Sequence, residues 1–356
     1  MQNIKISLLM PVYNTEIQFL AECVKSIKKR SFSEWELCII DDGSNKDTAD
    51  YCESLTIDER IKVFHQKNKG VGSSRNTGTK IAQGDYVMYV DSDDVLAPFA
   101  LEEAINVANE YKADIVYGGV IKVNSHKSFY NSLCDKKGSE RRCVDANVLR
   151  KRFFGEKVKG LCDIQGGAYV GRGPVARLIK RSIALSVEFP LDMPIGEDLV
   201  WNLRILNKSN KNIIVNSIWY GYVEYSNSSI SKYYGNRSEL VVNFLNVIKD
   251  ENSSFFNMHK DIVGCLLARE LYCIIKYDKL LLSNHKVMQK NNKSITSLLR
   301  SEPWALLSKS EYNKSLSKFQ RIFLLLCYMG YGVSSIFIYN KIKDIKNQLK
   351  YKISSF

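Results

Sequence analysis

The sequence of 356 residues predicts an α/β fold, in which a mostly parallel sheet with flanking helices is followed by a C-terminal helical region. Over the first 120 residues, apolar runs of strand length alternate with segments of helical periodicity, a pattern typical of βαβ units. The strand runs are almost continuously apolar, which favours a sheet that is covered on both faces. From about residue 237 onward the pattern is helical and contains no obvious catalytic constellation.

The first strand is expected at residues 4–13, where a β-rich run ends in a Pro-Tyr-Asn turn. A helix is expected at 16–30, because its apolar side chains share one helical face: Ile17, Phe19, Leu20, Cys23, Val24 and Ile27. The second strand covers 34–41. It leads into a helix at 45–55, for which Ser44 or Asn45 can serve as the N-cap.

The third strand, 61–66, precedes a helix at 71–83 that opens with glycine and serine. The fourth strand, 85–91, precedes a helix that starts at Pro98, a residue type favoured in the first helical turn. The fifth strand covers 113–123. The less regular stretch that follows is expected to hold helices at 175–185 and 198–209, and one or two strands at 212–225.

The composition suits an anionic partner, because the net charge is +13 and the isoelectric point is about 9.1. Nucleic acid, an anionic membrane surface and a phosphorylated ligand all remain open on this ground. The nine cysteines are scattered without a C-x-x-C pair and no secretory signal is visible, which favours free thiols in a reducing cytosol. The four histidines are far apart in the sequence, and no role is assigned to any His or Cys.

Polar and ionisable residues follow four of the expected strands. The segments are "PVYN" after the first, "DDGS" after the second, "NKGVGSSRN" after the third and "DSDD" after the fourth. In an open α/β sheet, ligands bind beyond the carboxyl ends of the strands, so these segments are expected to form one site. Neither a G-x-G-x-x-G turn nor a P-loop is present, so phosphate must be held in another way.

Carboxylates can hold phosphate indirectly through a divalent cation, since Mg²⁺ uses one or two protein carboxylates together with substrate oxygens. Asp91 and Asp93 are the candidate ligands for such an ion. The alternative is that "DSDD" is a solvated turn whose Asp94 caps the next helix. A second acidic pair, Glu197 and Asp198 in "PIGEDLVW", could supply a general base or could simply start a helix.

Five motifs resemble glycosyltransferase family 2 in their order and spacing, over about residues 4–225. They are "SLLMPVYN", "IIDDGSNKDT", "NKGVGSSRNTG", "GDYVMYVDSDD" and "GEDLVWNLRI". The resemblance implies a GT-A fold and transfer of a sugar, with inversion at the anomeric carbon, from a nucleotide-sugar that is usually a UDP-sugar. It also implies a Mn²⁺ or Mg²⁺ cofactor.

The family's roles are carried over to the matching positions. Pro11, Val12 and Tyr13 would line the uracil and ribose pocket, Asp41 would accept the base N–H, and Arg75 would flank the nucleotide. Asp91 and Ser92 would contact the donor, and Asp93 would be the most direct metal ligand, with Asp91 sharing the ion or the ribose. Asp198 would be the catalytic base, with Glu197 as the second choice.

The resemblance implies a division of the chain into three parts. Residues 1–120 would bind the nucleotide-sugar, 121–225 would bind the acceptor and carry the base, and 226–356 would form a helical region. The charge-free stretch 322–340 is read as a buried hairpin, as an interfacial helix on anionic lipid, or as a membrane-spanning helix.

The function expected is addition of one sugar, hexosyl or N-acetylhexosaminyl, to a glycan or lipid-linked saccharide in surface polysaccharide biosynthesis. The location expected is the cytoplasm, with the inner face of the cell membrane as a surface for association. Two alternatives stay open: a sugar-phosphate nucleotidyltransferase, which also uses a carboxylate-bound metal, and a nucleic-acid-binding protein, which the charge alone suggests.

Overall fold

The computed structural model describes residues 4–28, 32–133, 140–224, 235–279, 285–336 and 338. It divides the chain into two compact units, of which the first holds residues 1–153 and 157–226 and the second holds 154–156 and 227–356. Each unit is described by itself.

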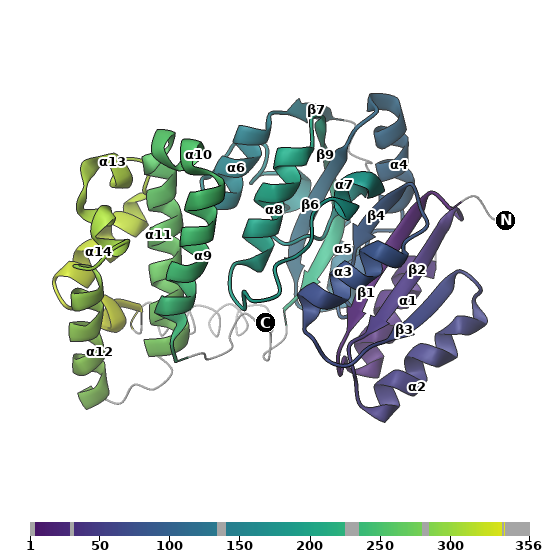
Figure 1. The fold of residues 1–356 in the computed structure, drawn as a ribbon, viewed down its shortest axis with the longest axis horizontal. Helices are drawn as coiled ribbons and strands as arrows, with labels where there is room; N and C mark the ends of the chain where they lie inside the picture. Colours follow the sequence, from purple (N-terminus) through teal and green to yellow (C-terminus); the bar gives the residue numbers. More distant parts are fainter. Residues whose placement is uncertain are drawn as a thin grey trace, which may run out of the picture. The chain divides into compact units, whose positions relative to one another are not determined.

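The first unit is built on a nine-stranded sheet with the order β3-β2-β1-β4-β8-β6-β9-β5, and β7 also pairs with β9 (Figure 1). The strands are β1 (Ile6–Val12), β2 (Trp35–Asp41), β3 (Ile61–His65), β4 (Tyr86–Tyr89), β5 (Val95–Leu96), β6 (Ile115–Val123), β7 (Arg141–Val144), β8 (Arg177–Lys180) and β9 (Asn212–Val223). Strands β1 to β4, β6 and β9 run in one direction, while β5, β7 and β8 run against their neighbours. The expected mostly parallel sheet is therefore confirmed, with antiparallel additions that the sequence pattern did not reveal.

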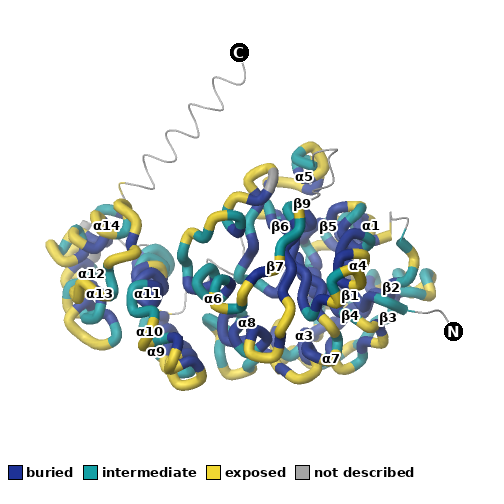
Figure 2. The backbone as a smooth tube through the Cα atoms, turned by 90° about the horizontal axis from the view of Figure 1, so that it is seen from above, coloured by how far each residue is buried: buried dark blue, intermediate teal, exposed yellow. Residues whose placement is uncertain are grey.

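Helices cover both faces of this sheet (Figure 2). The α-helices of the described sequence up to residue 208 are α1 (Ile17–Lys28), α2 (Lys46–Ser54), α3 (Val71–Ile81), α4 (Ala100–Tyr111), α5 (His126–Ser132), α6 (Ala146–Phe154), α7 (Arg181–Leu185) and α8 (Glu197–Lys208). Helices α1 and α4 lie on one face, and α3, α7 and α8 lie on the other. Strand β2 is buried at every position, as its continuous apolar run predicts for a sheet between two helical layers.

The segment 175–185 differs from its expected helix. Arg177–Lys180 forms β8, which pairs antiparallel with both β4 and β6, and only Arg181–Leu185 is helical. A short apolar run fits either state, and tertiary pairing decides between them. Residues 212–223 form one strand, within the expected range of one or two.

The second unit is helical. It contains α9 (Arg237–Glu251), α10 (Ser253–Met258), α11 (Lys260–Ile274), α12 (His285–Leu298), α13 (Ser310–Asn313) and α14 (Lys318–Tyr328). In the stretch 322–340, α14 ends at Tyr328 and Gly330 follows with a φ of +81°, so the described part of this stretch is not one continuous helix. Within the described residues, no helix has both the length and the apolar character that crossing a bilayer requires.

Candidate active site

The carboxyl ends of four parallel strands bring the polar motifs to one edge of the sheet. The strand register sets Val12 beside Asp41 and Asp41 beside His65, and on the other side of β1 it sets Leu9 beside Tyr89. The segments after these strands therefore leave the sheet side by side, where α/β proteins bind ligands.

Asp41 is buried at this edge and both of its carboxylate oxygens accept hydrogen bonds. Oδ1 accepts from the Ser44 amide at 2.9 Å, and Oδ2 lies 2.7 Å from Nδ1 of His65. Burial opposes ionisation of Asp41, but the bonds from Ser44 and His65 outweigh it and lower its pKa. The other ring nitrogen of His65 lies 2.7 Å from Glu53, and the two carboxylates raise the pKa of His65. The sequence assigns no role to His65, and the structure makes it a hydrogen-bond partner that orients Asp41.

The "PVYN" turn is tied to the neighbouring "DDGS" turn. The Asn14 amide donates to Ser44 Oγ at 3.0 Å, and Asn14 Oδ1 accepts from the Asn45 amide at 2.7 Å. Val12 is buried, whereas the side chain of Tyr13 is 55% exposed and is free to meet a ligand. The residue after the motif, Thr15, shares a 2.7 Å hydrogen bond with Ser92, which links this turn to "DSDD".

The "DSDD" turn is held from the far end of the sheet. The Asp91 amide donates to the hydroxyl of Tyr220 at 3.0 Å, and Asp94 Oδ1 accepts from the Val223 amide at 2.9 Å. The expectation that Asp94 caps the next helix is wrong, because Asp94 is buried against β9 and β5 separates it from α4. Burial and the charge of Asp91 raise the pKa of Asp93 to about 6, and burial beside both carboxylates raises that of Asp94.

Arg75 connects this acidic turn to the second acidic motif. Its guanidinium is buried and donates to Asp91 Oδ1 at 3.0 Å. Electrostatic attraction also joins it to Glu197 and Asp198, more than 120 residues away in the sequence. One arginine of "SSRN" thus faces carboxylates from both "DSDD" and "GED".

The neighbouring Asn76 fixes the loop that leads to "GED". Its side chain makes two hydrogen bonds with the backbone of Phe189, accepting from N–H at 2.8 Å and donating to the carbonyl at 3.0 Å. The Phe189 ring stacks on Trp201 with centroids 4.3 Å apart, and the edge of Tyr89 meets both rings at 5.4 Å. Trp201 is fully buried, so it belongs to this packed cluster rather than to an open sugar platform.

Helix α8 starts with the two candidate bases. Gly196, with a φ of +85°, turns the chain so that Glu197 and Asp198 occupy the first helical turn. Burial and the charge of Asp198 raise the pKa of Glu197 to about 7, and the nearby cations Arg75 and Arg172 oppose this rise only in part. Asp198 Oδ1 accepts a 2.7 Å hydrogen bond from the Leu199 amide. A carboxylate whose pKa lies near neutrality is suited to accept a proton at physiological pH.

Residues 7–163 match the family model described as "Glycosyl transferase family 2". Over this segment, which is less than half of the chain, the protein resembles that family. It is 27% identical to Glycosyltransferase GlyG of Streptococcus pneumoniae over 226 residues, which are 63% of this chain and 72% of the relative. It is 30% identical to the uncharacterized glycosyltransferase EpsJ of Bacillus subtilis, covering 63% of this chain and 62% of that one.

The fold is similar to that of solved structures. Residues 1–349 of S. aureus TarS, in complex with UDP-GlcNAc, superpose with a TM-score of 0.61 at 18% identity, covering 93% of this chain and 89% of TarS 1–349. The likeness confirms the expected GT-A fold with a C-terminal helical region. The similarity to named glycosyltransferases favours sugar transfer over nucleotidyl transfer or nucleic-acid binding.

The acidic turn is a candidate site for a divalent cation. Among the described residues, no group of three or more His, Cys, Asp or Glu side chains is placed to hold an ion. Two protein carboxylates suffice for Mg²⁺ when substrate and water complete its shell. Burial and the charge of Asp91 raise the pKa values of Asp93 and Asp94, so a bound cation would favour their ionised forms and fits the donor set.

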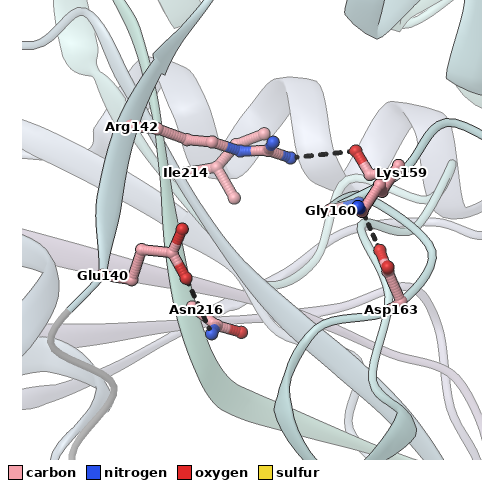
Figure 3. A pocket seen from close by; sticks show the side chains of 7 residues that line it. All are labelled: Glu140, Arg142, Lys159, Gly160, Asp163, Ile214 and Asn216. Carbon is pink, nitrogen blue, oxygen red and sulfur yellow. Dashed lines mark hydrogen bonds between the residues drawn. The ribbon is translucent and has the colours of Figure 1, made fainter.

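A separate polar cavity of about 320 Å³ lies beside β7 and β9 (Figure 3). Arg142 reaches across it toward the Lys159 carbonyl, and Asn216 donates to Glu140 at 3.4 Å on the strand side. Asp163 accepts from the Gly160 amide on the opposite wall. None of the expected site residues lines this cavity, and its two cations are balanced by two carboxylates.

Proposed function

We propose that this protein is an inverting, metal-dependent glycosyltransferase that moves one sugar from a nucleotide-sugar to a hydroxyl group of a saccharide acceptor. The donor class proposed is a UDP-sugar, and the acceptor is a glycan or lipid-linked saccharide of surface polysaccharide biosynthesis. The family match and the likeness to TarS, whose structure is titled as a complex with UDP-GlcNAc, support the donor class.

The buried Arg75 is the observation that carries the proposal. Its 3.0 Å ion pair with Asp91 and its attraction to Glu197 and Asp198 draw the donor motif and the base motif around one guanidinium. A site that holds a nucleoside diphosphate needs positive charge, and a site that activates a hydroxyl needs a carboxylate. Both requirements meet here around the buried guanidinium of Arg75.

The reaction requires a single displacement. A carboxylate of "GED" accepts the proton of the acceptor hydroxyl, and the oxygen forms a new bond to the anomeric carbon on the face opposite the donor phosphate. The bond between that carbon and the phosphate oxygen breaks, and its electron pair leaves with the nucleoside diphosphate. A single displacement of this kind inverts the anomeric carbon and needs no covalent intermediate.

Asp93 and Asp91 would hold the divalent cation, Mn²⁺ or Mg²⁺. When bound, the cation would neutralise charge on the diphosphate. Asp91 would then be shared between the ion and Arg75, which explains why its backbone is anchored by Tyr220. Tyr13, exposed beside Asp41, would stack on the base, with Pro11 and Val12 behind it and Ser92 facing the donor.

Asp198 is proposed as the base, with Glu197 as its competitor. The motif favours Asp198, whereas the pKa of about 7 favours Glu197. The two assignments differ in kinetics. Asp198→Asn should reduce transfer by about 10²–10⁴-fold, the usual contribution of a general base, and leave donor binding nearly intact. If Glu197→Gln has that effect instead, Glu197 is the base.

The proposal is tested by thermal shift of the full chain with UDP-, GDP- and CDP-sugars, each with and without Mn²⁺. A UDP-sugar with Mn²⁺ at about 100 times its Kd should stabilise the protein by about 2.7 kcal/mol. Asp93→Asn should remove the metal-dependent part, while Lys46→Asn, on exposed α2, serves as the control. If no nucleotide stabilises the protein with any divalent cation, the proposal fails.

A further inference from the structure

Helix α14 exposes an apolar stripe on the second unit. The side chains of Phe319, Ile322, Leu325 and Met329 are 52–59% exposed and recur at intervals of three or four residues, so they share one face. The opposite face of the helix is buried through Phe323, Leu324 and Cys327. The helix is therefore apolar on two sides, and only one of them contributes to the core of its unit.

The end of this stripe borders a cavity of about 580 Å³. Met329 and Tyr331 belong to its lining, and Lys293 and Arg300 of the α12 segment line it as well, whereas no carboxylate does. Among the described residues, the lining of this cavity therefore combines apolar surface with two cations and no carboxylate.

Helix α12 fixes the stripe and the cavity in one arrangement. The buried Asn292 accepts from the Val333 amide at 2.8 Å and donates to Ser334 Oγ at 2.9 Å. The Thr296 hydroxyl donates to the Cys327 carbonyl at 3.2 Å. The turn at Gly330 is thus hydrogen-bonded to α12 through residues on both of its sides. These bonds hold the apolar stripe next to the basic cavity.

The charge of the chain is concentrated in the same two segments. Residues 279–301 and 312–343 contain no Asp or Glu, and each contains five Lys or Arg. They therefore hold a net charge of +10 out of +13 for the whole chain. Lys318 and Arg321, both exposed, lie on α14 beside the stripe.

An apolar face beside Lys293, Arg300 and Lys318 fits an anionic lipid surface. Apolar side chains enter the boundary between headgroups and acyl chains, and Lys or Arg side chains meet anionic headgroups. A soluble polyanion would use the cations but would leave the apolar stripe in water. We propose that the α14 stripe, with Lys293, Arg300 and Lys318, is a docking surface for an anionic membrane.

The test is flotation of the full chain with vesicles of phosphatidylcholine alone or with 30% phosphatidylglycerol. The chain should bind the anionic vesicles at least about tenfold more tightly, and binding should fall at 0.5 M salt. The measurement uses no sugar donor or acceptor. Vesicle binding can therefore be absent while the proposed transferase activity is present, and vesicle binding can be present while that activity is absent.

Two sets of variants separate the contributions. Ile322→Ser/Leu325→Ser/Met329→Ser should weaken binding to both kinds of vesicle by tenfold or more, while Ile57→Ser/Met258→Ser, also highly exposed, should change nothing. Lys293→Gln/Arg300→Gln/Lys318→Gln should weaken binding to anionic vesicles by about fivefold per residue. The control Lys46→Gln/Lys67→Gln/Lys249→Gln removes the same net charge from exposed sites elsewhere.

Three outcomes would overturn the proposal. The first is that the full chain does not bind vesicles. The second is that the stripe variant and its control bind vesicles equally well. The third is that the chain binds soluble polyphosphate through the three cations but does not bind vesicles. The last outcome would identify a polyanion site instead. Circular dichroism of each variant establishes that the helices are intact before binding is compared.

Discussion

At the scale of single residues, the candidate site depends on three partly buried carboxylates around one buried arginine. Arg75 donates to Asp91 and is attracted to Glu197 and Asp198, so removal of Arg75 would leave three carboxylates without this shared cation. Burial and the charge of Asp198 together raise the pKa of Glu197 from 4.5 to about 7.

The raised pKa of Glu197 predicts how stability depends on pH. Between pH 4.5 and 7 the folded chain holds the Glu197 proton more tightly than the unfolded chain does, so ionisation of this group destabilises the fold as pH rises. The stability of Glu197→Gln relative to the unmodified protein should therefore increase as the pH rises from 5 to 8, by up to about 3 kcal/mol. Urea unfolding at both pH values measures this difference.

The exposed Glu59 gives a matched control for that experiment. Glu59→Gln should show the same stability difference from the unmodified protein at pH 5 and pH 8. If Glu197→Gln behaves in the same way as Glu59→Gln, Glu197 ionises normally in the folded protein.

At the scale of elements, contacts between distant segments build the site, and the link from α3 to Phe189 is the clearest. Asn76→Ala would remove both hydrogen bonds to the Phe189 backbone and leave two buried backbone groups without partners. We expect a loss of about 2–4 kcal/mol in the free energy of unfolding. The loop before "GED" would lose its anchor, so kcat should fall more than KM rises.

Asn109→Ala, on the exposed face of α4, is the control for this change. Chemical denaturation and steady-state kinetics of both variants test the prediction. A normal kcat in Asn76→Ala, with reduced stability, would show that the loop keeps its place without this contact.

In the helical unit, α11 and α13 approach each other too closely for a side chain at Gly264. A Cβ atom there would lie 1.6 Å from the Tyr312 carbonyl oxygen. Gly264→Ala should force α13 away and cost about 1–3 kcal/mol or more, despite the better helix propensity of alanine. Gly173→Ala, where nothing lies within 4 Å, should stay close to neutral in a parallel melting experiment.

The sequence predicted most strands and helices, because long apolar runs and helical periodicity are local signals. It also predicted that "PVYN", "DDGS" and "DSDD" meet, since parallel strands end at one edge. It did not predict β8, whose state depends on pairing with β4 and β6, or the roles of His65, Asn76 and Tyr220. Each of these residues acts through a partner that is distant in sequence, and a single sequence does not encode such a pairing in any local pattern.

At the scale of the whole molecule, the charge is divided unevenly. Outside the two segments free of Asp and Glu, the chain has a net charge of only +3, so its basic character belongs mainly to the helical unit. The composition indicated an anionic partner, but the location of the charge became informative only when the exposed apolar stripe was found beside it.

The fold of the first unit rests on its sheet and its two helical layers, and so a bound cation should matter for activity rather than for folding. Treatment with EDTA should abolish sugar transfer and should change the Tm of the protein without nucleotide by less than about 2 °C. Mn²⁺ or Mg²⁺ added in excess should restore transfer. A large drop in Tm on EDTA treatment would instead identify a structural ion.

The anchoring of "DSDD" by β9 has a consequence for biosynthesis. Asp91 and Asp94 are translated early, but their partners Tyr220 and Val223 come about 130 residues later. On the ribosome, the first three strands can pair while this acidic turn still lacks both anchors. A nascent chain therefore cannot assemble its donor site until residue 223 has left the exit tunnel, by which time nearly the whole first unit is available to fold around it.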